Sequence, residues 1–375
     1  MLVIIYSTLI IGLLATLMFF FKLPKIGKVM KEAMESRSGV TYLSVSIIIP
    51  ARNEESNLPH ILNDLMKQTY PIHEIICVDD GSKDRTPNII KKYSELGLVK
   101  VKGIGVENLP KGWKGKAWAC QSGAKAADGE LVLFIDSDVR FSEKAVELLV
   151  ESYLQKGKPI SVQPYHSMKK QYEYLSLFFN LIEVCGTGLS ILGNRVTQGF
   201  FGPVLLIEKR VFSKFGGYER VKNRVIEDFD LGKYLGRNAV SIELFLGGKD
   251  ISFRMYSKSI KEVIEGWSKN FASGSFAMNR WLFIAIVWWI GYLILLPTLL
   301  IRGIIMSDSQ NIIILSGLYI ISVMLLYRAA RSVGSYPFLI CLVYPIYLLG
   351  FQFIYFYSII GTYLLKTTTW KGRRL

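Results

Sequence analysis

The sequence predicts an α/β fold: a doubly wound, mainly parallel sheet with membrane-embedded segments attached. Three observations support this prediction. From residue 45 onward, short apolar runs typical of buried strands alternate with helical patterns. Acidic residues follow two of these runs directly, at the strand ends where such sheets bind ligands. Apolar runs long enough to cross a membrane lie near both ends of the 375-residue chain.

The expected elements of the sheet domain follow one another from residue 45. A buried strand at 45–50 precedes a helix with helically spaced apolar residues between Leu58 and Leu65. The next elements are a strand ending at Asp80, a helix near 87–96, a strand at 99–106, a helix from about Ala117, a strand at 131–135 and a helix at 143–154. Beyond residue 160 the pattern changes. Residues 172–192 fit either a buried helix or a helix in the membrane interface, and residues 257–276 have an interfacial composition.

Residues 1–21 form an almost uncharged run. Because no basic segment precedes this run and no small-residue cleavage site ends it, a retained transmembrane anchor is favoured over a cleaved signal peptide. A basic linker at 22–44 follows. Its first lysines are Lys22, Lys25, Lys28 and Lys31. The positive-inside rule then places the sheet domain in the cytoplasm, at the cell membrane.

The C-terminal membrane region, 281–375, contains three further apolar runs. Those at about 281–301 and 311–327 each have the length of one span. The last run, 336–365, is longer and is interrupted by Pro345 and Gly350. The number of crossings in this last run is left open by the pattern.

The charges around the last run create a parity problem. Arg328 and Arg331 before it, and the tail residues Lys371, Arg373 and Arg374 after it, should all lie in the cytoplasm. One crossing between them cannot satisfy both groups. A hairpin or re-entrant segment could, although each half of the run is short for a full crossing.

Composition narrows the possible partners. The net charge of +15 is explained by basic residues beside apolar segments, where they meet anionic lipid headgroups, so we expect a membrane and no nucleic-acid partner. The four cysteines form no Cys-x-x-Cys pair, and the three histidines are dispersed. A His-based zinc site is therefore not expected.

Two acidic motifs follow apolar strands. Asp79 and Asp80, before Gly81, could form a simple turn that caps the next helix, or could accept hydrogen bonds from a base or ribose. Asp136 and Asp138 lie one residue apart after a five-residue apolar strand, where a cation would relieve the repulsion between them. Oxygen ligands favour Mg²⁺ or Mn²⁺ over zinc.

Two further motifs are ambiguous alone. Glu227 and Asp228 could be acidic residues in the first turn of a helix, or could provide a general base that deprotonates or orients an attacking acceptor. Lys114 and Lys116 precede a helix without the spacing of a P-loop. Such a lysine could neutralise a diphosphate or could simply be solvated.

Taken together, the motifs resemble those of family 2 glycosyltransferases, which are inverting enzymes with the GT-A nucleotide-diphospho-sugar transferase fold. The likeness covers about residues 45–276, our predicted cytoplasmic catalytic domain. The motifs that carry it are Ile49-Pro50-Ala51-Arg52-Asn53-Glu54-Glu55, Asp79-Asp80-Gly81-Ser82, Asp136-Ser137-Asp138, Gly216-Gly217-Tyr218 and Glu227-Asp228-Phe229-Asp230-Leu231-Gly232.

The resemblance implies a role for each site residue. The nucleotide sugar would be bound by Pro50, Arg52, Glu54, Asp79, Asp80, Lys116 and Asp136. Asp138, with Asp136 nearby, would hold the Mg²⁺ or Mn²⁺ ion. Asp228 would act as the base beside Glu227, and Gly202 and Trp267 would lie on the acceptor side.

Within the family, four shorter motifs resemble the carotenoid-acid (diaponeurosporenoate) glycosyltransferases. They are Ser161-Val162-Gln163-Pro164-Tyr165-His166, Phe201-Gly202-Pro203-Val204, Phe253-Arg254-Met255-Tyr256 and Glu265-Gly266-Trp267. The sequence departs from processive polysaccharide synthases, which carry Gln-x-x-Arg-Trp, because Gly266 precedes Trp267 here. This departure favours the addition of one sugar to one lipid.

We therefore expect transfer of a single hexose, from UDP-glucose, to a carotenoid or other isoprenoid at the cytoplasmic membrane face. The alternatives are transfer to a polyprenyl phosphate or to a ceramide- or hopanoid-type lipid, a nucleotidyltransferase, and a non-catalytic nucleotide-sugar-binding membrane protein. A polyprenyl phosphate hardly needs a base, a nucleotidyltransferase would release pyrophosphate, and a binding protein would bind the donor without turnover.

Overall fold

The computed structural model describes residues 2–28, 42–106, 108–190, 199–224, 226–364, 369–370 and 373–374. It divides into two compact units. The sheet unit contains Pro24–Ser167, Arg195–Met255 and Thr369–Leu375, and the apolar-helix unit contains Met1–Leu23, Met168–Asn194 and Tyr256–Thr368. Most of the predicted basic linker, including Lys31, and Lys371 of the tail lie outside the described residues.

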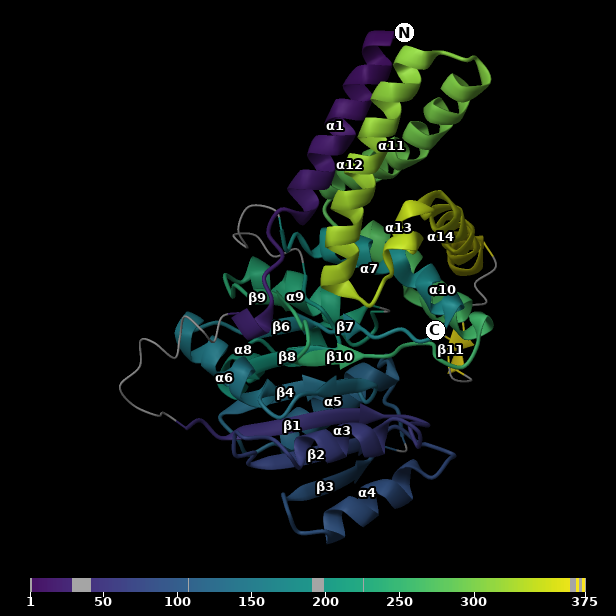
Figure 1. The fold of residues 1–375 in the computed structure, drawn as a ribbon. Helices are drawn as coiled ribbons and strands as arrows, with labels where there is room; N and C mark the ends of the chain where they lie inside the picture. Colours follow the sequence, from purple (N-terminus) through teal and green to yellow (C-terminus); the bar gives the residue numbers. More distant parts are fainter. Residues whose placement is uncertain are drawn as a thin grey trace. The chain divides into compact units, whose positions relative to one another are not determined.

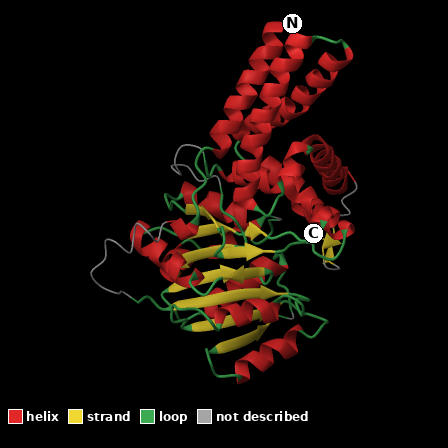
Figure 2. Ribbon diagram, in the orientation of Figure 1, coloured by secondary structure: helices red, strands yellow, loops and turns green. Residues whose placement is uncertain are grey.

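The sheet unit is built on a seven-stranded sheet with the order β3-β2-β1-β4-β8-β6-β9 (Figures 1 and 2). These strands are β1 (Val45–Ala51), β2 (Glu74–Asp79), β3 (Val101–Gly105), β4 (Leu131–Ile135), β6 (Ile160–Gln163), β8 (Val204–Glu208) and β9 (Glu243–Leu246). Pairing is parallel except around β8, which runs antiparallel to both β4 and β6. The predicted α/β class with a mainly parallel sheet is confirmed.

Helices flank the strands of the sheet, and the first four of those named next match the predicted alternation. They are α3 (Leu58–Leu65), α4 (Thr86–Glu95), α5 (Gly115–Ala126), α6 (Ala145–Lys156), α8 (Lys209–Lys214), the 3₁₀ helix η3 (Gly217–Val221) and α9 (Glu227–Arg237). All five residues of β4 are buried, and their continuous apolar run is what is expected of a strand covered on both faces. In α5, Gly123 has no side chain to keep the helix away from Ile48 and Val78, so the helix lies close against the sheet.

The described residues also form two small sheets. A three-stranded sheet has the order β5 (Val139–Phe141), β10 (Ile251–Phe253), β7 (Tyr165–His166). In the tail, β11 (Thr369–Trp370) pairs with β12 (Arg373–Arg374). The turn between β4 and β5 contains Asp136 and Asp138.

The apolar-helix unit contains the membrane candidates. Its helices are α1 (Leu2–Phe20), η1 (Gln171–Ser176), α7 (Leu177–Thr187), α10 (Ile260–Ala277), α11 (Arg280–Ile305), α12 (Ser309–Val333), α13 (Phe338–Leu342), α14 (Tyr344–Ile359) and the π-helical turn η4 (Ile360–Leu364). Three stretches of the described chain are long and apolar enough to cross a membrane: 280–305, 309–333 and 344–362. The protein is therefore membrane-associated.

The predicted anchor, α1, is a packed helix of this unit. Its described apolar stretch, 5–20, is shorter than the three candidate spans. The Trp289 indole donates to the Thr16 hydroxyl over 3.0 Å, and Tyr6 donates to Asn311 over 2.7 Å. Figure 1 shows α1 running beside α11 and α12.

The two segments beyond residue 160 also group with the apolar helices. In α7, Phe178 and Phe179 are fully buried, so over its described residues this segment is a buried helix. In α10, Trp267 stacks on Phe179 at a ring distance of 4.7 Å and donates to Ser176 over 2.9 Å. The acceptor-side role of Trp267 stays a prediction.

Candidate active site

The loops that follow β1 and β2 are joined at the carboxyl end of the sheet. The Asp80 amide donates to the carbonyl of Ala51 over 2.9 Å. Arg52 donates to the Asp80 carbonyl over 2.5 Å, and its guanidinium lies 3.6 Å from the Asp80 carboxylate. The predicted nucleotide-binding residues Arg52 and Asp80 therefore form one charged pair.

Further polar contacts fix the two turns. Asn53 has a positive φ of 53°, accepts from the Lys83 amide over 2.8 Å, and donates through its own amide to Ser82 over 2.9 Å. The Glu54 amide donates to the Thr86 hydroxyl over 2.8 Å. Asp79 accepts from the Ser82 amide over 3.1 Å, so a turn is present at Asp79, but Asp79 does not cap the next helix, because α4 follows Arg85 without a side-chain cap. Pro50 is the one partly exposed residue of β1 and lies just before the first of these turns.

An acidic centre lies after β4. The Asp136 amide donates to the Pro203 carbonyl over 2.9 Å, which fixes the strand end beside the loop that precedes β8. The ammonium of Lys116, from the first turn of α5, lies 2.8 Å from Asp136 and 2.9 Å from Asp228. One lysine thus bridges carboxylates from two elements far apart in the sequence.

Asp228 is held by groups on several sides. Tyr218 donates its hydroxyl to Oδ1 over 2.6 Å, and Lys116 donates to Oδ2 over 2.9 Å. Gly202 packs against the same carboxylate, and a β-carbon at this position would overlap Oδ2. Glu227, the first residue of α9, directly precedes Asp228 in the sequence and is buried. The carboxylate of Asp228 therefore has a defined orientation before any substrate binds.

The charges in this centre are strongly coupled. Removal from water lowers the pKa of Lys116, but Asp136, Asp228 and Glu227 outweigh that effect and raise it well above the usual value. Burial raises the pKa of Asp136; Lys116 opposes this rise, whereas Asp228 adds to it. Burial, followed by the charge of Asp228, raises the pKa of Tyr218 well above its usual value. Lys116 and Tyr218 therefore stay protonated and act as donors.

The donor set fits a divalent ion shared with a substrate. Within the described ranges, no group of three or more His, Cys, Asp and Glu side chains could enclose a metal. Asp136 and Asp138 are both partly exposed on either side of Ser137. Mg²⁺ typically binds through one or two carboxylates together with substrate phosphates and water, and Mn²⁺ also prefers oxygen ligands. Two carboxylates at this turn meet that requirement.

The structure brings together many of the predicted site residues. In the loops after β1 and β2, Arg52 pairs with Asp80. After β4, Lys116 contacts both Asp136 and Asp228, and Gly202 packs against Asp228. Trp267 belongs to the apolar-helix unit. The predicted roles of all these residues stay predictions.

Sequence reasoning missed the role of two residues. Tyr218 was recognised only as part of the Gly216-Gly217-Tyr218 motif, although its hydroxyl contacts Asp228. Gln121 in α5 accepts from the Tyr218 amide over 2.9 Å and fixes the backbone of that turn. Nothing in the sequence around Gln121 distinguishes it from an ordinary helical residue.

Comparison with known proteins adds three findings. Residues 46–215 match the family model described as glycosyl transferase family 2. The chain is 37% identical over 260 residues to a 4,4'-diaponeurosporenoate glycosyltransferase of Staphylococcus haemolyticus, covering 68% of each chain. It is 31% identical over 339 residues to the enzyme of that name from Staphylococcus aureus, covering 88% of each chain.

A solved structure supports the fold. The mannosyltransferase PcManGT from Pyrobaculum calidifontis, solved with GDP-Man and Mn²⁺, superposes with a TM-score of 0.54 at 13% identity. The match covers 94% of the present chain and 99% of that one. The sequence-predicted GT-A fold is thereby confirmed.

Proposed function

The chain belongs to glycosyl transferase family 2, and we propose that it transfers one hexose from UDP-glucose to a carotenoid carboxylic acid, with inversion at the anomeric carbon. The names of the two staphylococcal relatives support this acceptor. Family membership favours glycosyl transfer over the nucleotidyl transfer and non-catalytic binding considered from the sequence. UDP-glucose is our expectation for the donor.

The observation that carries this proposal is the oriented carboxylate of Asp228. It lies within hydrogen-bond reach of Tyr218 and of Lys116, which also contacts Asp136 at the end of β4. A general base must be fixed close to the proton that it removes. Asp228 takes the proton of an acceptor carboxylic acid or hydroxyl, or orients an acceptor that is already ionised.

The reaction is a single displacement. The acceptor oxygen forms a bond to the anomeric carbon as the bond from that carbon to the diphosphate oxygen breaks. The negative charge that develops on the departing diphosphate is stabilised by Lys116, which also pairs with Asp136, the residue that follows β4. Arg52 and Asp80 at the neighbouring strand ends bind the nucleotide.

Asp138, with Asp136, would hold the divalent ion against the diphosphate. Such an ion supplies positive charge that offsets the charge of the leaving group. The Mn²⁺ in the complex of the mannosyltransferase PcManGT supports this part of the proposal. The identity of the ion is tested by comparing Mg²⁺ and Mn²⁺ in donor-binding titrations.

The membrane helices suit a lipid acceptor, since such a molecule partitions into the bilayer. Lys22, Lys25 and Lys28 follow α1, and by the positive-inside rule these lysines support a cytoplasmic location for the sheet unit. We propose that transfer takes place at the cytoplasmic face of the cell membrane.

Mass spectrometry of lipid extracts tests the reaction. Cells that make the carotenoid acid are compared with and without the protein, with Asp138→Asn as the control variant. We expect a lipid heavier by one hexose that is absent in the variant. No new glycolipid, despite correctly inserted protein and available acceptor, would overturn the proposed acceptor class.

A further inference from the structure

Helix α14 has the length and composition of a membrane span, as part of the stretch 344–362. We propose instead that α13 and α14 form a re-entrant segment, which enters and leaves the bilayer on the side where α12 ends. Its apolar outer face would contact the acyl chains of that leaflet alone. The proposal rests on contacts within the apolar-helix unit and is independent of the chemistry proposed above.

Tyr344, the first residue of α14, lies beside the midpoints of the neighbouring helices α11 and α12. The Tyr344 hydroxyl donates to the Leu293 carbonyl over 3.0 Å, and its ring stacks on Tyr319 at 5.4 Å. Leu293 is near the middle of α11, roughly 20 Å from Arg280 at 1.5 Å per residue. Tyr319 is near the middle of α12 and donates to the Leu342 carbonyl, just before α14, over 2.6 Å.

A proline explains why Tyr344 binds at that level. Pro297 lies inside α11 and has no N–H for the carbonyl four residues earlier, which is that of Leu293. An unpaired carbonyl is costly in lipid, so a break of this kind needs a partner from the protein. The fully buried Tyr344 hydroxyl supplies that partner. Helix α14 is thereby tied to the middle of α11.

The other end of α14 returns toward α10. Ser358 donates to the Ser268 carbonyl over 2.5 Å, and the hydroxyls of Tyr355 and Ser275 are 3.0 Å apart. Helix α10 ends at Ala277, immediately before α11 begins, so these contacts lie toward the end of the bundle where α11 starts. In Figure 1, α1, α11 and α12 run lengthwise, whereas α14 is seen nearly end-on and so crosses their direction.

The two faces of α14 differ in what they contact. One face packs into the unit, where Phe351 meets Phe179 at 4.9 Å and Phe271 at 5.7 Å. The opposite face exposes apolar side chains at helical spacing. These are Ile346, Leu349, Phe353 and Phe356. A row of large exposed apolar side chains next to membrane spans fits acyl chains.

Sidedness supports the same conclusion. Helix α12 carries Arg328 and Arg331 near its end, and Arg373 and Arg374 follow α14. A crossing by α14 would place the tail opposite Arg328 and Arg331, against the positive-inside rule. A re-entrant segment removes the parity problem noted from the sequence.

Thiol labelling from each side of the membrane tests the topology. An impermeant maleimide is applied to intact cells and to inverted vesicles carrying Ser309→Cys, Ser332→Cys, or the full chain with one cysteine added after Leu375. The four native cysteines are buried and provide the background. We expect the added cysteine to label from the same side as Ser332→Cys. Labelling together with Ser309→Cys would show that α14 crosses and would overturn the proposal.

A rescue experiment tests the hydrogen bond between the Tyr344 hydroxyl and the Leu293 carbonyl. Tyr344→Phe removes the donor for the Leu293 carbonyl and should lower the melting temperature of the purified full-length protein. Pro297→Ala restores a backbone N–H to that carbonyl. We expect Tyr344→Phe to cost several degrees alone and close to none in the Pro297→Ala background. Equal losses in both backgrounds would show that Tyr344 does not serve this carbonyl.

Discussion

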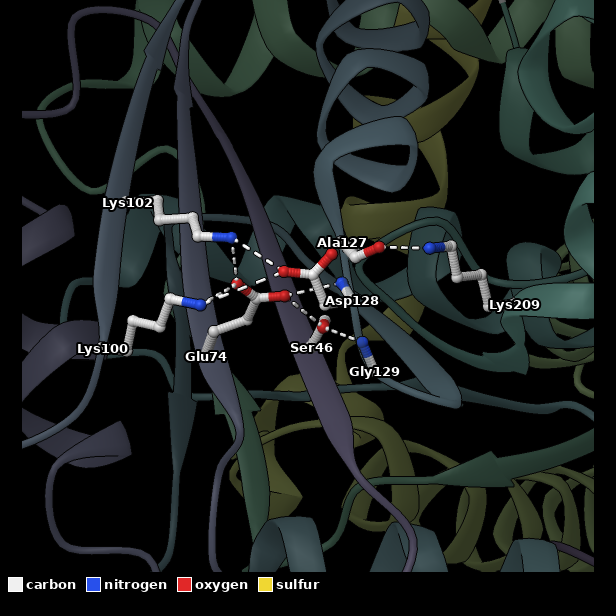
Figure 3. A network of polar contacts seen from close by, with 8 residues as sticks. All are labelled: Ser46, Glu74, Lys100, Lys102, Ala127, Asp128, Gly129 and Lys209. Carbon is white, nitrogen blue, oxygen red and sulfur yellow. Dashed lines mark hydrogen bonds and ion pairs between the residues drawn. The ribbon is translucent and has the colours of Figure 1, made fainter.

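At each end of the seven-stranded sheet a carboxylate lies beside a lysine, but the pKa of the carboxylate is lowered at one end and raised at the other. At the amino end, Glu74 is fully buried and lies 2.7 Å from Lys102 and 3.7 Å from Lys100 (Figure 3). It also accepts from Ser46 over 2.8 Å and from the Asp128 amide over 2.7 Å. Burial opposes the charge, but Lys102 and the other donors lower the pKa of Glu74 to about 2.

At the carboxyl end the balance is reversed. One lysine, Lys116, serves both Asp136 and Asp228, and the pKa of Asp136 is raised because burial outweighs the lysine. At the amino end two lysines serve one buried carboxylate, that of Glu74, and the exposed carboxylate of Asp128. A carboxylate whose partners are complete stabilises the fold, whereas surplus negative charge favours binding of a cation. The amino end therefore holds a network that stabilises the fold, whereas the carboxyl end keeps a surplus of negative charge that a cation could offset.

The largest expected effect is on catalysis at the carboxyl end. Asp228→Asn keeps the size of the side chain but removes the base, so kcat should fall about 10²- to 10⁴-fold. The melting temperature should change little. Sugar transfer at saturating donor is measured, with Glu227→Gln as the neighbouring control, for which we expect a smaller loss. Near-normal turnover of Asp228→Asn would refute the assignment of the base.

The next largest effect is on stability at the amino end. Glu74→Gln removes a buried charge that is paired with two lysines and should cost about 3 kcal/mol of unfolding free energy, from a pKa of about 2 against a reference of 4.5. Because the folded pKa is lowered, this contribution is complete above about pH 4.5 and is lost as the pH falls toward 2.

Thermal unfolding between pH 3 and 7 measures this contribution. The wild type should lose stability toward acid more steeply than Glu74→Gln, and the variant should keep its turnover per folded molecule. Parallel stability curves for the two proteins would show that Glu74 contributes no acid-dependent stability.

The sheet and the strand-end acids could be predicted from local sequence. Buried parallel strands read as uninterrupted apolar runs, so β2 and β4 were visible, and Asp80 and Asp136 were placed directly after them. Neither β8 nor its reversed direction was predicted, because an apolar run carries no information about which neighbour it pairs with. Long-range pairing decided that feature.

The contacts inside the site were less predictable. Lys116 and Asp228 are 112 residues apart in the sequence, and no periodicity indicates that they meet. The position of Tyr218 depends on left-handed backbone at Gly216 and Gly217, which turns the chain so that its hydroxyl meets Asp228. The hydrogen bond from Tyr344 to the Leu293 carbonyl, which Pro297 leaves without a backbone donor, could not be predicted either, because these residues are also far apart in the sequence.

A smaller effect is expected from the tyrosine that orients Asp228. Tyr218→Phe removes one hydrogen bond to a charged group, worth about 1.5–3 kcal/mol, so kcat should fall roughly ten- to a hundredfold. A double-mutant cycle separates this role from a general loss of folding. In the Asp228→Asn background, Tyr218→Phe should cost little more activity. Independent, additive losses would indicate that Tyr218 does not act through Asp228.

The smallest effect comes from a pair of matched serines. Ser46 donates to Glu74 and accepts from the Gly129 amide over 2.8 Å in each case. Ser161 donates to the Phe201 carbonyl over 3.0 Å and accepts from the Phe201 amide over 2.9 Å, next to Gly202. Alanine at either position should cost about 1–2 kcal/mol of unfolding free energy, because each hydroxyl makes two buried bonds.

Only the second serine should also affect the reaction. Ser161→Ala loosens the loop that packs on Asp228 through Gly202, so kcat should fall severalfold, whereas Ser46→Ala should leave kcat unchanged. Unfolding curves and initial rates measured on the same preparations give both quantities. If Ser46→Ala lowered kcat as much as Ser161→Ala, stability at the amino end would be coupled to chemistry at the carboxyl end. The separation drawn between the two networks would then fail.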